Sequence, residues 1–446
     1  MKLESPKNAN YAATVVAISA IVNLENCNNI QAAIIFGNSV IVSKDVKVGD
    51  VGLFFPLETK LSREFLSANN LFRDSLKNAD QAKKGFFEDN ARIRCVKFRG
   101  NKSEGFYVPL TSLEYIDQGM PGNLQVGDCF DKIELHEICE KYIPRDNRVG
   151  GPQNARDKKA VRITRLVENQ FRLHIDTEQL RKNVQKIHPD DYISITNKLH
   201  GTSWVVGNVL CKRKLSLIDK VARFLGIKVR EHEYDIIYAS RNVVKNRFFT
   251  DTLVNPLGYY GEDLWGSIAK RVKDCIPQGF TLYGEAVGYL ESGRMIQAGY
   301  HYGAAKGTFD SYVYRITQTN EEGKVTELSW PQTEEFCRHF GLKCVPCFYY
   351  GQAKYLFPIS IGLDIDEKWH DKFLSEIQKR FITDSMCPMN NEEVPEEGIV
   401  VRVDGLFNVL PLKLKNYRFL EKETKDLDSE VVDIETEQSI ATDEQV

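Results

Sequence analysis

Short apolar runs rich in β-branched residues follow one another along the first part of the chain. The runs are residues 13–22, 32–43, 51–55 and 92–98. Turn-forming pairs separate them at Gly37-Asn38, Gly49-Asp50 and Gly100-Asn101. Several short strands joined by turns are typical of a small barrel, so we predict an OB-like β domain over residues 1–130. An unrelated β domain is the alternative interpretation.

Apolar and polar residues alternate at period two again farther along the chain. Residues 193–197 alternate in this way and end at Lys198, which predicts a half-buried strand with a lysine at its end. Four further runs follow at residues 280–286, 312–316, 396–402 and 412–416. Each of these runs carries or adjoins charged or aromatic residues, so the strands are candidates for positioning a site.

Two of these runs place chemical groups side by side. Alternation puts Tyr312 and Tyr314 on one face of their strand, where an aromatic ring could stack on a purine. It also sends Lys413 and Lys415 to one face and the leucine before each of them to the other. Two adjacent cations suit a triphosphate. The pattern therefore indicates a nucleotide site.

The segment around Lys198 has the features of a nucleophilic amine. Lys198 ends a strand, His200 follows it, and Gly201 allows a close turn beneath a phosphate. The string is weak by itself, because a strand-end lysine before a glycine turn is a common structural arrangement. Its position ahead of the acidic, aromatic and dicationic strands makes the catalytic interpretation stronger.

Five strings in this order resemble the motifs of a known superfamily. They are Lys198-Leu199-His200-Gly201, Tyr283-Gly284-Glu285, Tyr312-Val313-Tyr314-Arg315, Glu397-Gly398-Ile399-Val400 and Lys413-Leu414-Lys415. They are similar to motifs I, III, IIIa, IV and V of the covalent nucleotidyltransferases, which include DNA ligases, RNA ligases and mRNA capping enzymes. Residues 238–242 resemble motif Ia more loosely, and from them only Arg241 is carried over.

Two features resemble the RNA ligase branches. His200 at the third position of motif I, followed by Gly201-Thr202-Ser203, is similar to RNA ligase 2, whereas DNA ligases and capping enzymes usually have Asp there. Residues 49–56 and 61–66 resemble the N-terminal domain of Deinococcus-type RNA ligases, in which an OB-like module precedes the catalytic domain.

The resemblance implies an α+β fold, with an OB-like β-barrel followed by an ATP-grasp-like nucleotidyltransferase domain of antiparallel sheets and helices. We expect the OB-like domain at 1–130, a linker at 131–165, the adenylyltransferase domain at 166–420 and an acidic, disordered tail at 421–446. The implied activity is ATP-dependent joining of RNA 3′-hydroxyl and 5′-phosphate ends in RNA repair. ATP and magnesium or manganese would be cofactors, and a nicked or bridged RNA duplex would be the partner.

The same resemblance assigns nucleotide-binding roles. Tyr314 is expected to stack on adenine, and Asn197 to contact the base or the ribose edge. Glu285 would accept hydrogen bonds from the ribose hydroxyls. Arg241 would hold phosphate through its planar guanidinium. The full set of ATP-binding candidates is Asn197, Lys198, Gly201, Arg241, Glu285, Tyr314, Glu397, Lys413 and Lys415.

Catalysis is expected to centre on Lys198, which would attack the α-phosphate of ATP. Glu397 would hold a metal-bound water nearby, since hard cations prefer oxygen ligands. Lys413 and Lys415 would bind the α-phosphate and the departing pyrophosphate. The role of His200 does not transfer from relatives that have Asp, and a structural hydrogen bond at the turn is its alternative. The catalytic candidates are Lys198, His200, Glu285, Glu397, Lys413 and Lys415.

Composition fits an intracellular enzyme. The chain of 446 residues is long enough for two or three domains. Its ten cysteines are scattered without a disulfide framework, which favours reduced thiols. It lacks an 18-residue apolar run and an apolar N-terminal segment. We therefore expect a soluble, cytoplasmic monomer without a membrane partner.

Charge is distributed unevenly. Residues 421–446 contain ten acids and two lysines, so the other 420 residues carry +5 of the total of −3. Residues 211–235 form a basic insertion with apolar residues at helical spacing. Its cations are Lys212, Arg213, Lys214, Lys220, Arg223, Lys228 and Arg230. The insertion would suit a phosphate backbone or form a solvated helix face.

Other functions remain as alternatives. A DNA ligase or an mRNA guanylyltransferase shares the superfamily, although His200 and the lack of a recognisable OB module after Asn416 favour neither. A catalytically silent RNA-binding relative is the alternative from another class. The intact Lys198, Glu285 and Glu397 favour an enzyme.

Overall fold

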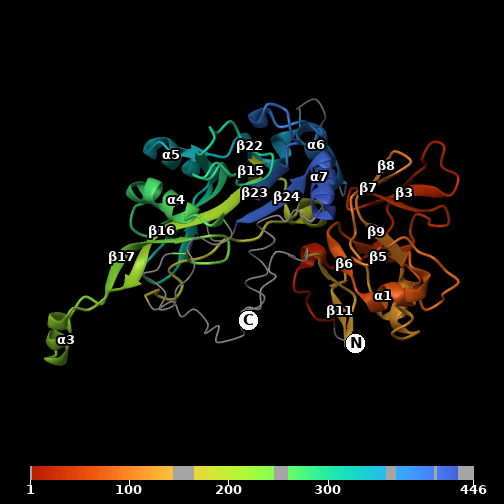
Figure 1. The fold of residues 1–446 in the computed structure, drawn as a ribbon, viewed down its shortest axis with the longest axis horizontal. Coiled ribbons are helices and arrows are strands. Elements are labelled where there is room, and N and C mark those ends of the chain that lie inside the picture. Colours follow the sequence, from red (N-terminus) through yellow and green to blue (C-terminus); the bar gives the residue numbers. More distant parts are fainter. Residues whose placement is uncertain (1–2, 144–164, 246–259, 358–367, 406–408, 430–446) are drawn as a thin grey trace. The chain divides into compact units, whose positions relative to one another are not determined.

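The structure of this protein is a computed structural model that describes residues 3–143, 165–245, 260–357, 368–405 and 409–429 of the 446. The chain divides into two compact units (Figure 1). The first unit comprises residues 1–144, 370–375 and 420–429, and the second comprises residues 145–369, 376–419 and 430–446. Both units contain helices and mainly antiparallel sheets, so the fold is of the α+β class.

The first unit is built from short strands. They are β1 (Ala13–Ala17), β2 (Ala20–Val22), β3 (Ile30–Ile35), β4 (Asn38–Ser43), β5 (Val51–Phe55), β6 (Thr59–Leu61), β7 (Val96–Phe98), β8 (Asn101–Ser103), β9 (Phe106–Pro109), β10 (Cys129–Phe130), β11 (Lys132–Ile133), β12 (His136–Glu137) and β13 (Cys139–Lys141). The helix α1 (Arg63–Ala68) follows β6. The four predicted runs correspond to β1 with β2, β3 with β4, β5 and β7, so those predictions are confirmed.

The turns of two hairpins explain their glycines. Ile35 pairs with Asn38, and the two residues between them, Phe36 and Gly37, have positive φ values of 51° and 72°. The hairpin of β7 and β8 likewise turns through two residues of positive φ, the second being Gly100. Two-residue turns of this kind match the twist of the strands they join. The breaks predicted at these positions are confirmed.

The strands of the first unit form several small sheets. One sheet has the order β10-β1-β5-β9 and another the order β2-β3-β4, and three further pairs are β11 with β12, β13 with β6 and β7 with β8. Through the described residues these sheets do not join into one closed barrel. The predicted β-rich domain is present, but the closed OB-like barrel is not observed.

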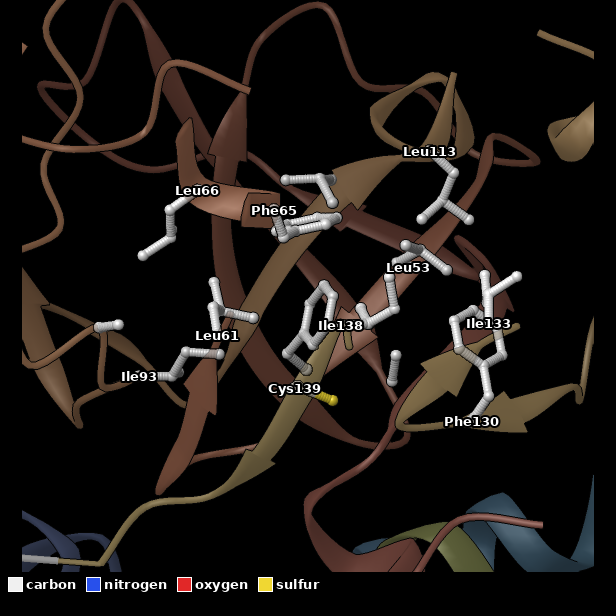
Figure 2. Close-up of a cluster of buried hydrophobic side chains, with 14 of the residues drawn as sticks. Leu53, Leu61, Phe65, Leu66, Ile93, Leu113, Phe130, Ile133, Ile138 and Cys139 are labelled. Carbon is white, nitrogen blue, oxygen red and sulfur yellow. The ribbon is translucent and has the colours of Figure 1, made fainter. Parts of the chain in front are cut away.

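A hydrophobic core lies among these strands and α1 (Figure 2). Leu53 of β5, Phe65 of α1 and Phe130 of β10 are fully buried in it. Ser62 begins α1, and its hydroxyl accepts a hydrogen bond from the Phe65 N–H at 3.1 Å. This cap satisfies an N–H that the first turn leaves without an intrahelical partner.

The boundary predicted at residue 130 is not a structural one. Ile133, Ile138 and Cys139 belong to the same core, and β11 to β13 pair with each other or with β6. The prediction of a linker over residues 131–165 was therefore wrong for its first part, because these buried residues complete the core. Residues 144–164 lie outside the described residues.

The predicted acidic tail also begins later than residue 421. The helix α7 (Tyr417–Asp428) includes its first residues. Thr424 is buried, and Asp428 pairs with the fully buried Arg92 at 2.8 Å. Burial and pairing order this segment despite its acidic composition. Residues 430–446, the rest of that tail, lie outside the described residues.

The second unit contains two larger sheets. Its strands are β14 (Glu178–Gln179), β15 (Tyr192–Lys198), β16 (Thr202–Lys212), β17 (His232–Ala239), β18 (Phe280–Gly288), β19 (Phe309–Thr319), β20 (Val325–Glu327), β21 (Lys343–Cys344), β22 (Cys347–Gln352), β23 (Gly398–Val403) and β24 (Leu410–Lys415). Its helices are α2 (Leu180–Asn183), α3 (Leu217–Phe224), α4 (Leu264–Val272) and α5 (Trp330–Phe340), and α6 (Trp369–Phe381) has residues in both units.

The strand β15 lies within a five-stranded sheet of order β14-β24-β23-β15-β22. The other sheet has the order β17-β16-β18-β19-β20 with β21 beside β19. Pairing is antiparallel except between β14 and β24 and between β19 and β21. The chain passes from the first sheet to the second between Lys198 and Thr202, so the predicted lysine lies where the two sheets connect.

Candidate active site

Three lysines lie on one face of the five-stranded sheet. Lys198 is opposite Gly398, which is opposite Lys415, and Thr196 and Lys413 share a pairing with Val400 in the same way. Residues directly opposite each other in a sheet share a face. Leu412 and Leu414 of β24 point to the other face and are buried. The predicted division of β24 into lysine and leucine faces is therefore confirmed.

Glu397 joins two of these lysines. The Lys198 Nζ lies 2.6 Å from Glu397 Oε1, and the Lys415 Nζ lies 3.7 Å from the same oxygen. The Glu397 side chain is only 2% exposed, whereas the two lysine side chains are 19% and 20% exposed. A buried carboxylate thus holds two ammonium groups that remain partly open to a ligand.

His200 completes this group. Its Nδ1 lies 3.7 Å from Glu397 Oε2, and its backbone N–H donates to the Tyr302 hydroxyl at 2.7 Å. Its ring meets the rings of Tyr300 and Phe419 edge to face, with centroids 4.8 and 5.0 Å away. These contacts fix the imidazole beside the shared carboxylate. The backbone hydrogen bond to Tyr302 fixes the turn, and the imidazole lies beside the carboxylate that also contacts Lys198.

Glu285 lies at the centre of β18 and is buried. Its Oε1 accepts from the Gly201 N–H at 3.1 Å, and its Oε2 accepts from the Ser203 hydroxyl at 3.3 Å. A Cβ at Gly201 would lie 2.2 Å from the Ala286 carbonyl oxygen, so any side chain there would push β18 away. The glycine of motif I therefore allows the connection after Lys198 to approach the strand that carries Glu285.

Asn197 points away from the lysine face. Alternation along β15 puts it on the side opposite to Lys198. Its amide donates to Glu396 Oε1 at 3.4 Å, and Ser385 donates to the other oxygen of that carboxyl. Burial raises the pKa of Glu396, and these two hydrogen bonds offset part of the rise. The structure therefore places Asn197 beside Glu396.

Tyr314 occupies a β-bulge. Gly284 of β18 pairs with Val313 and Tyr283 pairs with Arg315, which leaves Tyr314 as the extra residue between them. A bulge bends the strand and redirects the side chain it carries. The Tyr314 hydroxyl lies 2.8 Å from His174 Nδ1, and the two rings meet edge to face at 5.9 Å. Tyr312 belongs to one hydrophobic cluster, and Tyr314 packs against that cluster and against a second one. The bulge interrupts the alternation from which a common face of these two residues was predicted.

Arg241 follows β17 and binds a carboxylate. Its guanidinium donates to Asp176 Oδ1 at 2.6 and 3.2 Å. Burial alone would raise the pKa of Asp176, but the positive charge of Arg241, with smaller effects from His174 and Lys413, lowers it. The carboxylate is thus held ionised among cations. Two residues predicted to bind phosphate, Arg241 and Lys413, act on one anionic group.

Sequence reasoning missed several residues of this site. His174 and Asp176 precede motif I, and the alternation from Arg172 to Asp176 was the signal that could have indicated them. Tyr302 and Phe419 lie outside the motifs, and their contacts with His200 arise only from the folded chain. The site therefore extends beyond the five strings.

Glu397 fits a metal-bound water. Its Oε2 is buried without a hydrogen-bond partner among the residues that the structure describes. Within the same ranges, no group of three or more His, Cys, Asp or Glu side chains could hold a metal ion. A Mg²⁺-type ion is commonly held by one or two carboxylates together with water and substrate phosphates. The residues present fit that kind of site.

This geometry, with a strand-end lysine beside a buried glutamate and further cations, defines a nucleotidyltransferase-like site. A family model described as RNA ligase matches residues 191–415, a range that contains all of the predicted site residues. The chain belongs to the RNA ligase family. A comparison with curated proteins finds no match.

Solved structures of a Naegleria gruberi RNA ligase share the fold. A lysine-to-methionine mutant with AMP and Mn is 17% identical with a TM-score of 0.55, and covers 92% of this chain and 98% of that chain. A lysine-to-alanine mutant with ATP and Mn is 17% identical with a TM-score of 0.56, and covers 94% and 99%. An aspartate-to-alanine mutant without ligand is 16% identical with a TM-score of 0.54, and covers 93% and 98%. The similarity therefore extends along both units.

Proposed function

We propose that this protein is an ATP-dependent RNA ligase that joins 3′-hydroxyl and 5′-phosphate ends through a lysyl-AMP at Lys198. The observation that carries the proposal is the contact of Lys198 with the buried Glu397, which Lys415 shares. Membership of the RNA ligase family supports the activity. Structures of the Naegleria gruberi enzyme with ATP or AMP and Mn support the choice of cofactors.

In the first step, the Lys198 nitrogen attacks the α-phosphorus of ATP. A nitrogen–phosphorus bond forms, the bond to the bridging oxygen breaks, and pyrophosphate leaves. The amine must lose protons to react, and Glu397 at 2.6 Å is placed to hold one. Lys415 then lies close enough to stabilise negative charge on the phosphate as it develops.

The next two steps use the same AMP group. An RNA 5′-phosphate oxygen attacks the phosphorus of lysyl-AMP, which releases Lys198 and leaves AMP joined to the RNA end. The 3′-hydroxyl then attacks that 5′-phosphate and expels AMP, so the new phosphodiester replaces the activated bond. The His200 Nδ1 lies 3.7 Å from Glu397 Oε2, so this ring can interact electrostatically with the Glu397 carboxylate in each step.

The nucleotide contacts follow from side-chain type. Tyr314 offers a ring for adenine, and Glu285 offers acceptors near the connection that follows Lys198. Arg241 and Lys413 would exchange their interaction with Asp176 for phosphate oxygens. Asn197 would reach the base or ribose edge only if its contact with Glu396 is given up. A divalent metal, if bound through water to Glu397, would neutralise negative charge on the phosphates.

The substrate and setting are proposed more broadly. We propose that the first unit is the OB-like module that the resemblance implies. Its proposed role is to engage nicked or bridged RNA duplexes. A-form shape and the 2′-hydroxyl are the features by which such a protein could distinguish RNA. None of the ten cysteines forms a disulfide, which supports the reducing, cytoplasmic setting that we propose. A role in RNA repair is proposed on the resemblance to RNA ligases. We also propose that the protein acts as a monomer.

Intact-mass spectrometry after mixing with ATP and magnesium or manganese tests the first step. The wild-type chain should gain the mass of AMP, and Lys198→Ala should not. Lys212→Ala is a matched control, since Lys212 is an exposed lysine at the end of β16, the next strand along the chain. An adduct that persists in Lys198→Ala, or one formed only with GTP, would disprove the assignment.

Sealing assays test the substrate. Two nicked duplexes should be compared that differ only in ribose or deoxyribose at the terminal 3′ nucleotides. We expect faster sealing when the 3′-hydroxyl strand ends in ribose, and faster sealing on the bridged duplex than on free single strands. Equal rates, or a preference for deoxyribose, would favour a DNA ligase instead.

A further inference from the structure

Among the residues that the structure describes, the helix α3 packs against no hydrophobic core. It connects β16 and β17, whose last paired residues are Lys212 and His232. Figure 1 shows α3 beyond the ends of these strands, apart from the sheets of its unit. None of its residues is buried. The helix therefore stands on the end of a two-stranded arm.

The exposed face of α3 is apolar. Leu217 and Ile218 are 80% and 81% exposed, Val221 is 57% exposed and Phe224 is 90% exposed. Leu225 and Ile227 extend the same surface, so six of the 19 exposed large hydrophobic residues of the described chain lie within eleven consecutive positions. We call these six residues the α3 patch. A contiguous exposed apolar patch marks a surface that binds something.

The helix is nevertheless specified locally. Ser216 and Asp219 form a capping box, with the Asp219 N–H donating to the Ser216 hydroxyl at 3.1 Å and the Ser216 N–H donating to Asp219 at 2.9 Å. Arg213 also pairs with Asp219. Such a cap satisfies two backbone N–H groups at the start of a helix. The patch is therefore presented on a capped helix.

Cations surround the patch. Seven Lys and Arg side chains lie between Lys212 and Arg230, against the single acid Asp219. Lys214, Lys220 and Lys228 are exposed, and no described residue forms an ion pair with them. On the helix, Lys220 and Arg223 project from the side opposite to Ile218 and Leu225. The surface thus combines an apolar face with a positively charged surround.

The length of α3 and the side chains of the α3 patch favour one kind of partner over others. An eight-residue helix is about 12 Å long, far too small to supply the roughly 800 Å² per partner of a stable protein interface. RNA would bind the cations, but it offers no apolar surface for Leu217, Ile218 and Val221. An anionic bilayer binds both kinds of side chain. Apolar side chains enter the acyl boundary, and lysines and arginines contact the anionic headgroups.

We propose that α3 is a peripheral membrane anchor that inserts the α3 patch into the surface of an anionic lipid bilayer. The predicted absence of a membrane partner was based on the lack of a long apolar run. No helix in the described ranges is long and apolar enough to cross a bilayer, but a helix that lies in the surface needs no such length. The anchor does not depend on the proposed ligase activity.

Vesicle flotation with the full-length protein tests the anchor. The probes are vesicles of phosphatidylcholine alone and of phosphatidylcholine mixed with phosphatidylserine. We expect binding to the mixed vesicles that weakens with added salt. Phe224→Glu should reduce binding roughly tenfold or more, because one buried aromatic side chain is lost from the interface. Leu135→Glu is the matched control, since Leu135 is an 89% exposed leucine of the first unit.

Charge variants complete the test. The pair Lys220→Gln and Arg223→Gln should weaken binding to the mixed vesicles, whereas Lys83→Gln with Lys84→Gln should not. Unchanged lysyl-AMP formation would show that the variants are folded. Failure to bind either vesicle, or equal binding by Phe224→Glu, would overturn the proposal. Self-association lost in Phe224→Glu without vesicle binding would assign the patch to a second copy, and loss of RNA binding alone would assign it to RNA.

Discussion

Glu397 is the side chain on which the proposed chemistry depends most. It is nearly fully buried and contacts Lys198, Lys415 and His200. Glu397→Gln keeps the shape but removes the charge, so lysyl-AMP formation should fall roughly a hundredfold or more, as expected for about 3 kcal/mol of lost electrostatic stabilisation. Glu393→Gln, at a 68% exposed side chain, should form the adduct at the wild-type rate. Near-normal adduct formation by Glu397→Gln at saturating ATP and metal would place the site elsewhere.

Lys245 illustrates a buried charge outside the site. It is 9% exposed, and its Nζ lies 4.8 Å from the centre of the Trp265 ring. Burial lowers the pKa of Lys245 below its ordinary value of 10.5, and Asp263 offsets only part of this. The ammonium form therefore costs folding free energy below the lowered pKa, and that cost disappears as pH rises through it toward the unfolded value.

Urea unfolding across a pH series measures this cost. Relative to wild type, Lys245→Met should be more stable at neutral pH, and the difference should shrink as pH rises toward 10.5. Lys270→Met changes an exposed lysine of α4 and should leave the pH dependence unchanged. A stability difference between Lys245→Met and wild type that does not vary with pH would contradict this account.

Among the elements, β19 contains a β-bulge that sets the direction of a candidate site residue. The bulge at Tyr314 gives this ring a direction that regular alternation would not. If the ring stacks on adenine, Tyr314→Ala should raise the KM for ATP roughly tenfold or more, since stacking contributes about 1–3 kcal/mol. Tyr314→Phe keeps the ring and removes the hydroxyl contact with His174, which is worth about 1 kcal/mol. Equal effects of the two variants on adduct formation would argue against stacking.

At the scale of the whole molecule, we propose that the two units have different tasks. All candidate site residues lie in the second unit, whereas the first unit has its own core. A chain that begins at residue 154 should therefore still form lysyl-AMP. It should seal nicked RNA more slowly, by roughly tenfold or more, if the first unit contacts RNA phosphates as we propose. Gel-based sealing rates and intact mass, measured on the same preparation, check this. Sealing at the full-length rate would show that the first unit does not engage RNA.

The alternation of apolar and polar residues by itself determined many of the strands. It located the strands around Lys198 and the lysine face of β24, because period two depends only on which side of one strand is buried. The order of the charged and aromatic strings then indicated a nucleotide site. Apolar runs and turn residues similarly indicated the strands of the first unit.

Only the folded chain decided how these parts meet. The bulge at Tyr314 and the sharing of Glu397 by Lys198 and Lys415 depend on register between strands that are distant in sequence. The helical structure of residues 421–428 depends on burial and on the ion pair of Asp428 with Arg92, and composition cannot reveal either. The exposure of α3 also depends on the folded chain. A helical apolar pattern predicts a face that packs against something, and only the tertiary structure shows that the described residues leave this face exposed.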